Sequence, residues 1–97
     1  MKPKIYIANK GSHDYSSAEQ YGELIFLTTG LLQPYGTNQM VKVFTEFIDK
    51  SSSEDYILMS GLPVATSILC SLFAKRHGKL NLLLFRNPGY IARELVL

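Results

Sequence analysis

The chain has 97 residues, with 10 Lys and Arg against 8 Asp and Glu, one cysteine and no tryptophan. This length supports one domain, and 46% hydrophobic with 19% charged residues excludes a disordered or collagen-like protein. A formal charge of +2 is too small to make nucleic acid the expected partner. The lone Cys70 excludes an internal disulfide and a multi-cysteine zinc site.

The first third of the chain predicts a strand, a short helix and a second strand. Residues 4–8 are rich in β-branched and aromatic side chains, which favours a strand. Ser16 and Glu19 have the spacing of a capping box, so Ser16 is expected to cap a short helix that Gly22 ends. Residues 24–28 form a continuous apolar run, typical of a strand buried on both faces.

The middle of the chain predicts a loop, a helix and a third strand. Residues 31–36 contain Pro and Gly and read as a loop, after which Thr37 or Asn38 can cap a helix. Residues 51–55 form a polar connector, and 56–59 form the third strand. The helix between them has an apolar stripe at Met40, Val43, Phe44, Phe47 and Ile48.

The last third predicts a second helix and a hairpin. Pro63 suits the first turn of a helix, and Gly78 suits its left-handed end. Residues 80–85 and 90–97 are expected to be antiparallel strands joined by a type II turn with Pro88 and Gly89 at its centre. The core stripe of this helix is Ala65, Ile68, Leu69, Leu72 and Phe73.

These elements predict an α/β protein, a single small three-layer domain over residues 1–97. Continuous apolar strands separated by helices indicate a mostly parallel five-stranded sheet with an antiparallel C-terminal hairpin. Residues 56–74 carry no charge, but the turn residues 60–63 favour a strand, a turn and a buried helix over a membrane span. The N-terminus lacks the apolar region of a signal peptide, so we expect a soluble, intracellular protein.

The loops that follow the first three strands are the candidate site. Parallel sheets bind ligands beyond the carboxyl ends of their strands, and small or hydroxylated residues there suit an anion. His13 could bind a phosphate, and Tyr15 and Tyr35 could stack on a base. We therefore expect a nucleotide or another phosphate-bearing small ligand, although these residues are also ordinary turn and cap residues. The candidate ligand-binding residues are Ser12, His13, Asp14, Tyr15, Thr28, Thr29, Tyr35, Ser60 and Gly61.

Catalysis, metals and cofactors are not expected. The chain has neither GxGxxG nor GxxxxGK[ST], and Ser60 lacks the first glycine of a GxSxG elbow. His13 and Asp14 are adjacent and do not form an oriented pair, while His77 falls at the opposite end of the architecture. Cys70 in an apolar helix behaves as a small hydrophobe. The basic residues of the second half read as helix-terminal cations rather than a nucleic-acid patch; they are Lys75, Arg76, Lys79 and Arg86.

The second helix also carries a sign of self-association. Outside its core stripe, the positions from Val64 to Ala74 hold only small, uncharged residues, whereas a surface helix normally has a charged face. We therefore expect a homo-oligomer whose interface includes Thr66, Ser67, Cys70, Ser71 and Ala74.

Two segments of the chain carry a family resemblance. The run HDYS-x-AE-x-YG from His13 to Gly22 and the run KRHGKLNLLLF from Lys75 to Phe85 resemble a family of small proteins from tailed bacteriophages. The resemblance spans nearly the whole chain and implies the bacterial cytoplasm as the setting. It also makes antagonism of a host defence a natural role, either by binding a signalling nucleotide or by occluding a bacterial host or defence enzyme as a protein-interaction module.

Overall fold

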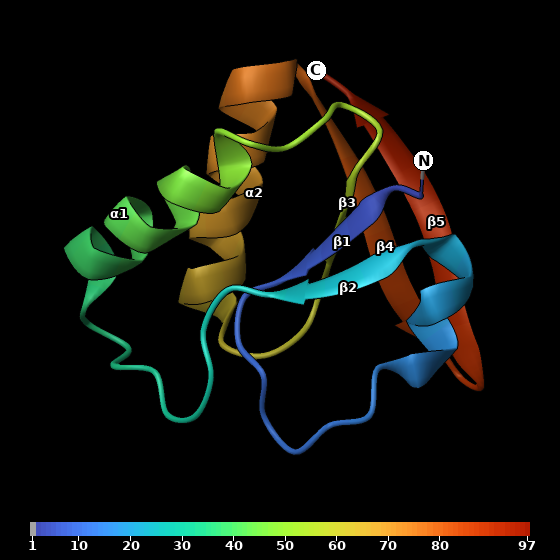
Figure 1. The fold of residues 1–97 in the computed structure, drawn as a ribbon, viewed down its shortest axis with the longest axis horizontal. Coiled ribbons are helices and arrows are strands. Elements are labelled where there is room, and N and C mark those ends of the chain that lie inside the picture. The colour runs from blue at the N-terminus through green and yellow to red at the C-terminus, as the bar shows by residue number, and fades with distance from the viewer. Residues whose placement is uncertain (1) are drawn as a thin grey trace.

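The computed structural model describes residues 2–97 as one five-stranded sheet with helices on both faces (Figure 1). The strand order is β2-β1-β3-β4-β5, in which the first four strands are parallel and the fifth is antiparallel. This confirms the α/β fold class and the C-terminal hairpin. The strands are β1 (Lys4–Ile7), β2 (Glu23–Phe26), β3 (Tyr56–Leu58), β4 (Lys79–Arg86) and β5 (Gly89–Val96), and the helices are the 3-10 helix η1 (Ser16–Tyr21), α1 (Thr37–Ile48) and α2 (Pro63–His77).

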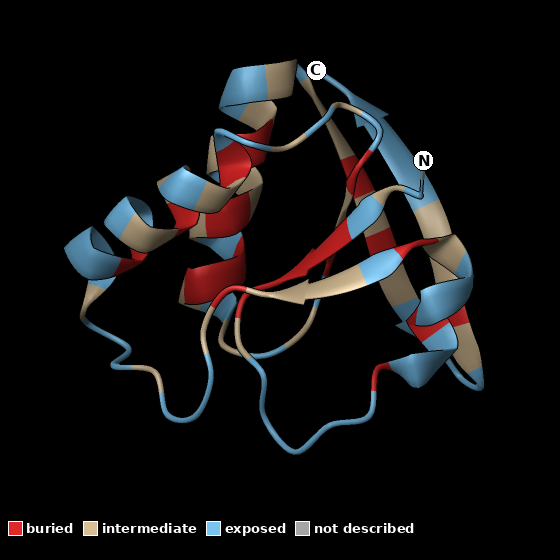
Figure 2. Ribbon diagram, in the orientation of Figure 1, coloured by how far each residue is buried: buried red, intermediate tan, exposed pale blue. Residues whose placement is uncertain are grey.

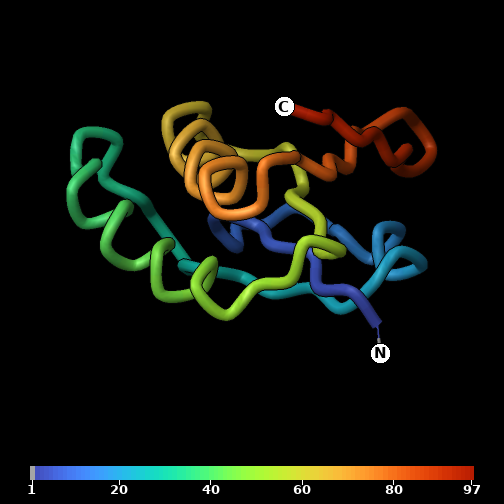
Figure 3. Tube along the Cα trace, turned by 90° about the horizontal axis from the view of Figure 1, so that it is seen from above, coloured from blue at the N-terminus to red at the C-terminus, as the bar shows by residue number. Residues whose placement is uncertain are grey.

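The sheet separates two apolar cores. Figures 1 and 3 show α1 and α2 together on one side of the sheet and η1 on the other. Along β1, Tyr6 packs into the core under α1 and α2, while Ile5 and Ile7 pack into the core under η1. Because both faces of the inner strands are buried (Figure 2), their sequences are continuously apolar rather than alternating.

The entry to η1 differs from the predicted capping box. Tyr15 is the residue before the helix, and Ser16 is its first residue. The side chain that accepts the Ser16 N–H is the Asp14 carboxylate, with Oδ1 at 2.9 Å. The prediction that Ser16 caps η1 is therefore wrong. Gly22 does end η1 as predicted, and its N–H donates to Glu19 O.

The two long helices follow their predicted stripes but not every predicted cap. In α1 the residue before the helix is Gly36 and no side chain caps it, so neither Thr37 nor Asn38 has the predicted role. The α2 prediction is confirmed at both ends, with Pro63 first and Gly78 in the left-handed conformation at φ 72°. Met40, Phe44 and Ile48 of α1 are buried, as are Ala65, Leu69 and Phe73 of α2.

The hairpin between β4 and β5 turns one residue earlier than predicted. Arg86 pairs with Gly89, which leaves Asn87 and Pro88 as the two central residues of the turn. The Asn87–Pro88 peptide bond is cis, and a cis proline in the second central position defines a type VI turn. The predicted type II turn is therefore wrong, because Gly89 already belongs to the ladder.

The outer edge of β5 is partly covered by side chains. The Leu97 N–H donates to a backbone carbonyl just before β4, so the register turns the carbonyls of Tyr90 and Ala92 away from β4. The Tyr21 hydroxyl donates to Tyr90 O at 2.9 Å, and Arg93 Nη1 donates to Ala92 O at 2.8 Å. These bonds occupy groups that would otherwise be open to pairing with another strand.

A buried carboxylate ties the sheet together at the amino ends of the parallel strands. Asp55 is 4% exposed, and it accepts the Lys4 N–H at 2.9 Å, the Tyr6 hydroxyl at 3.3 Å and the Ser52 N–H at 2.8 Å. Asn81 Nδ2 donates to Asp55 O at 2.9 Å. Burial, together with the Asp55 charge, raises the pKa of Tyr6 above its ordinary value, so its hydroxyl keeps its proton.

The uncharged run at residues 56–74 divides as predicted into β3, a turn and most of α2. Over residues 2–97, no helix is both long enough and apolar enough to span a bilayer. Packing within the protein explains the apolar residues of β3 and of the inner face of α2, whereas Ser67 and Ser71 on the outer face of α2 are exposed.

Candidate functional site

The strand order places a topological switch point between β1 and β3. The chain leaves β1 through η1 on one face of the sheet, and it leaves β3 through α2 on the opposite face. The loops after β1 and β3 therefore begin at neighbouring strand ends and run to opposite faces of the sheet. In open α/β sheets this is where ligands bind. Both loops lie along the exposed lower side of the molecule in Figure 2.

A pair of hydroxyl groups joins the two loops. Tyr15 Oη lies 3.0 Å from Ser60 Oγ, close enough for one hydroxyl to donate to the other. Tyr15 is buried, Ser60 is half-buried, and the exposed His13 ring lies 4.8 Å from the Tyr15 ring between centroids. The structure thus brings together three of the predicted residues, His13, Tyr15 and Ser60, from two loops. Tyr15 and Ser60, which form the hydroxyl pair, are 45 positions apart in the sequence.

Both loops also present backbone donors. Within residues 2–97, the N–H groups of Gly11, Ser12, Ser60 and Gly61 donate to no backbone or side-chain acceptor. Gly11, Ser12 and Gly61 are exposed. Unpaired N–H groups in loops are available as hydrogen-bond donors to an anion.

Asp14 makes a local contact at the start of η1. Its carboxylate accepts the Ser16 N–H at the start of η1, and bonds to the Ser16 backbone and side chain lower the pKa of Asp14. A carboxylate thus already occupies the position at this helix end that suits an anion. This contact orders the start of η1, and a ligand contact of Asp14 stays a prediction.

The loop after β2 contributes less than predicted. Thr28 Oγ1 lies 2.7 Å from Ala8 O and 2.8 Å from Asn9 Oδ1, so its single proton serves to hold the loop after β1. Thr29 forms a parallel bridge with Lys10, beside the same loop. Tyr35 is 94% exposed, and no aromatic ring lies near it within the described chain. The structure does not bring Thr29 or Tyr35 to the hydroxyl pair.

An aromatic row that the sequence did not reveal flanks the site. Phe85, which is 54% exposed at the end of β4, lies 6.4 Å from the His13 ring and 5.3 Å from the Tyr90 ring. Burial raises the pKa of Tyr90, so this member of the row stays neutral. The sequence showed only an apolar residue at a strand end. Each ring contacts the next in a chain of neighbours, with Lys10 over Phe26, then Tyr15, His13, Phe85 and Tyr90.

The remaining histidine lies apart from this site. His77 Nε2 is 2.8 Å from Ser51 Oγ at the amino side of the sheet, and its ring packs against Phe73. Among residues 2–97, no cluster of three or more His, Cys, Asp or Glu is arranged to hold a metal ion. The switch point therefore offers hydroxyls, N–H groups, one exposed imidazole and aromatic rings, with the Asp14 carboxylate and the Lys10 ammonium beside them.

The predicted interface on α2 is divided by the fold. Thr66 is buried, with Oγ1 3.1 Å from Pro63 O, so it belongs to the interior and its placement on an outer face is wrong. Ser67 and Ser71 are exposed and line a groove beside α1, whereas Ala74 is half-buried. Cys70 is also half-buried, its Sγ lies 3.6 Å from Met59 Sδ, and burial raises the pKa of its thiol.

The fold and the site define a small α/β protein with helices on both faces of its sheet and a switch point between β1 and β3. Residues 3–92 match the model of the phage Pam3 gp32-like protein family, and the chain belongs to that family. The resemblance to bacteriophage proteins is thereby confirmed at the level of the family. Neither the curated proteins nor the solved structures contain a significant match.

Proposed function

We propose that this phage-family protein binds a nucleotide or another small phosphate-bearing ligand at the switch point. The observation that carries the proposal is the meeting of two loops through Tyr15 and Ser60, with unpaired N–H groups on both. A phosphate can accept from these N–H groups and from the Ser60 hydroxyl once that hydroxyl turns away from Tyr15. Countering a host defence signal is the biological role that this binding would serve.

The aromatic row supports a nucleotide in particular. His13 and Phe85 present exposed rings next to the hydroxyl pair, and exposed rings are the groups on which a base packs. Because the Asp14 carboxylate is held at η1, we place the phosphate nearer Ser60 than Asp14. The ligand would then lie across the loops, with its base toward Phe85.

A panel of cyclic dinucleotides and ADP-ribose derivatives is expected to contain a ligand that raises the melting temperature. Mass action gives about 2.7 kcal/mol of stabilisation at a ligand concentration of 100 Kd. Ser60→Ala should weaken binding about fivefold, which corresponds to the loss of one hydrogen bond. The matched control is Ser17→Ala, since Ser17 is an exposed serine on η1. Equal ligand-induced shifts for the wild type and Ser60→Ala would contradict the site.

A second candidate function is a protein-interaction module that occludes a bacterial host or defence enzyme. The observation that favours it is a set of exposed apolar side chains around the same carboxyl edge, and such side chains are enriched at protein interfaces. No melting shift across the nucleotide panel, with recovery of a stoichiometric protein from bacterial lysate, would favour this candidate over ligand binding. The side chains are Leu31, Tyr35, Met59 and Phe85.

We also propose that two copies of the chain associate through the groove between α1 and α2. Two hollows of about 450 and 230 Å³ lie along this groove and share Val41 and Leu72 in their walls. Val64 and Ile68 continue the apolar wall of the smaller hollow, and Ser67 and Ser71 add no charge there, whereas Asp49, Lys75 and Arg76 line the larger hollow. Burial of this strip against a second copy would account for the uncharged outer positions of α2.

Light scattering is expected to give a mass of twice the 10.9 kDa of one chain at micromolar concentrations. Ser71→Glu places a charge in the groove and should shift the protein to the single-chain mass, because an unpaired charge is costly to bury. Ser17→Glu, on the opposite face of the sheet, is the control and should leave the mass doubled. A wild-type mass of 10.9 kDa throughout this range would contradict self-association.

A further inference from the structure

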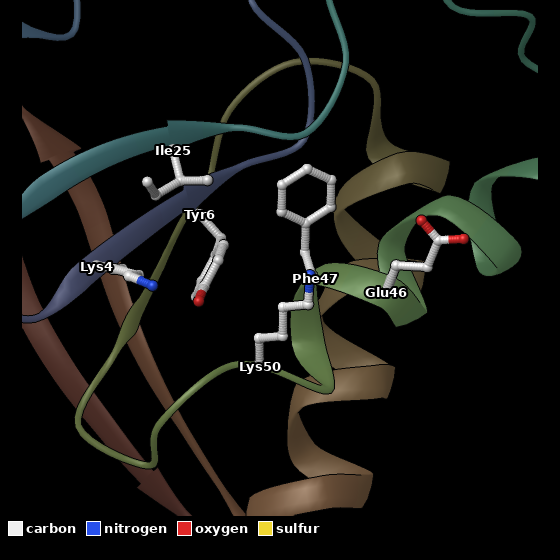
Figure 4. Close-up of a pocket in the computed structure, with 6 residues that line it drawn as sticks. All are labelled: Lys4, Tyr6, Ile25, Glu46, Phe47 and Lys50. Carbon is white, nitrogen blue, oxygen red and sulfur yellow. The ribbon is translucent and has the colours of Figure 1, made fainter.

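A pocket lies on the α1 side of the sheet, toward the amino ends of the parallel strands. It has a volume of about 270 Å³ and is formed by the start of β1, the middle of β2 and the end of α1. It is separate from the switch point, which is at the carboxyl ends of β1 and β3. Figure 4 shows its lining residues, which are Lys4, Tyr6, Ile25, Glu46, Phe47 and Lys50.

The pocket has an apolar wall that the fold holds in place. Tyr6 is 2% exposed, and its hydroxyl is bonded to the buried Asp55 carboxylate, which fixes the ring. Ile25 and Phe47 are half-buried and pack against the same core. In Figure 4 the Phe47 ring lies across the opening from Ile25 and Tyr6. A flat apolar group can therefore lie between the half-buried Ile25 and Phe47, next to the almost fully covered Tyr6 ring.

Two ammonium groups lie at the border of this apolar wall. Lys4 is exposed at the start of β1, and Lys50 is exposed just after α1. Within the described part of the chain, neither lysine has a carboxylate within the 4.0 Å that defines an ion pair. Glu46 also lines the pocket, but in Figure 4 its carboxylate points away from Tyr6 and Lys4. The opening thus combines ring-sized apolar surface with two available positive charges.

We propose that this pocket binds a single-ring aromatic carboxylate. The ring would lie among Tyr6, Ile25 and Phe47, and the carboxylate would accept from the ammonium groups of Lys4 and Lys50. Pockets for drug-sized ligands occupy roughly 300–1,000 Å³, so a volume of about 270 Å³ suits one ring and one anionic group. This site is independent of the nucleotide proposed at the switch point.

Amide NMR on the full chain tests the proposal with phenylacetate and its neutral counterpart phenylacetamide as probes. Phenylacetate should shift the amides of Lys4, Tyr6, Ile25, Phe47 and Lys50. The neutral probe should bind about fivefold more weakly or worse, because it lacks the charge-assisted contacts. Resonances of the loops after β1 and β3 should stay in place, which separates this site from the switch point.

A pair of lysine variants makes the test specific. Lys50→Gln should weaken phenylacetate binding about fivefold and leave phenylacetamide binding unchanged. Lys42→Gln is the matched control, since Lys42 is an exposed lysine of α1 outside the pocket, and it should bind phenylacetate as the wild type does. The proposal is overturned if the acid and the amide bind equally, if Lys42→Gln weakens binding as much as Lys50→Gln, or if phenylacetate shifts amides only outside the pocket.

Discussion

Asp55→Ala should lower the free energy of unfolding by about 3 kcal/mol, since each buried donor left without a partner costs about 1–3 kcal/mol. The carboxylate accepts two backbone N–H groups and the Tyr6 hydroxyl, and water that enters the gap would satisfy part of this set. Tyr6 belongs to β1, whereas Asp55 comes directly before β3. The loss should therefore loosen the amino side of the sheet.

Urea denaturation followed by circular dichroism measures this loss. Asp49→Ala is the matched control, because Asp49 is exposed and pairs with Arg76 at 3.5 Å on the surface. Surface ion pairs contribute about 0–1 kcal/mol, so the control should change stability little. Equal losses in the two variants would show that the Asp55 hydrogen bonds do not stabilise the fold as described.

Gly22→Ala is expected to destabilise the protein by at least about 2 kcal/mol, in the range of overpacking in a filled interior. A Cβ at Gly22 would overlap the backbone carbonyl of Pro3, which also accepts the Glu23 N–H at 2.9 Å. Backbone atoms cannot rotate away as a side chain can. The added methyl must therefore push apart the chain before β1 and the start of β2.

Thermal unfolding compares this variant with Gly11→Ala. A Cβ at Gly11 meets no atom within 4 Å, so that substitution should change stability by less than about 0.5 kcal/mol. A melting temperature of Gly22→Ala equal to that of Gly11→Ala would be incompatible with the close approach of Gly22 to Pro3.

The fold could be predicted from the sequence because a strand that is buried on both faces has a continuously apolar sequence. Ile5, Tyr6 and Ile7 are consecutive apolar residues since they alternate between two cores, each of which excludes water. The apolar stripes of α1 and α2 likewise indicate helices with one buried face. The order of the strands could not be predicted in this way, because any parallel arrangement of these strands would bury the same residues.

The helix starts were harder to predict because several residue types can satisfy the same backbone group. Ser16 and Glu19 have capping-box spacing, yet Asp14 approaches the Ser16 N–H from within the preceding loop. Thr66 was misplaced for a related reason. Its hydroxyl bonds to backbone oxygens within α2, and this allows a polar residue to be buried where a charged one could not be.

The candidate site could be predicted only in part. His13, Tyr15 and Ser60 follow strands that lie next to one another, and parallel strands bring such loops to one edge. Thr29 and Tyr35 follow the outermost strand β2, so they lie away from the switch point. Phe85 was missed because its contact with His13 depends on where β4 and β5 turn, which the sequence placed one residue too late.

Native mass spectrometry of the chain purified from bacteria tests ligand binding at the switch point most directly. We expect a co-purified phosphate-bearing small molecule on the wild type, at one per chain, and its loss in a Ser60→Ala, His13→Ala double variant that keeps the wild-type circular dichroism spectrum. Ser17→Ala should retain the adduct. Ligand binding at the switch point would be refuted by a wild-type chain that carries no small molecule and gains none from the nucleotide panel, or by an adduct retained in full by the double variant.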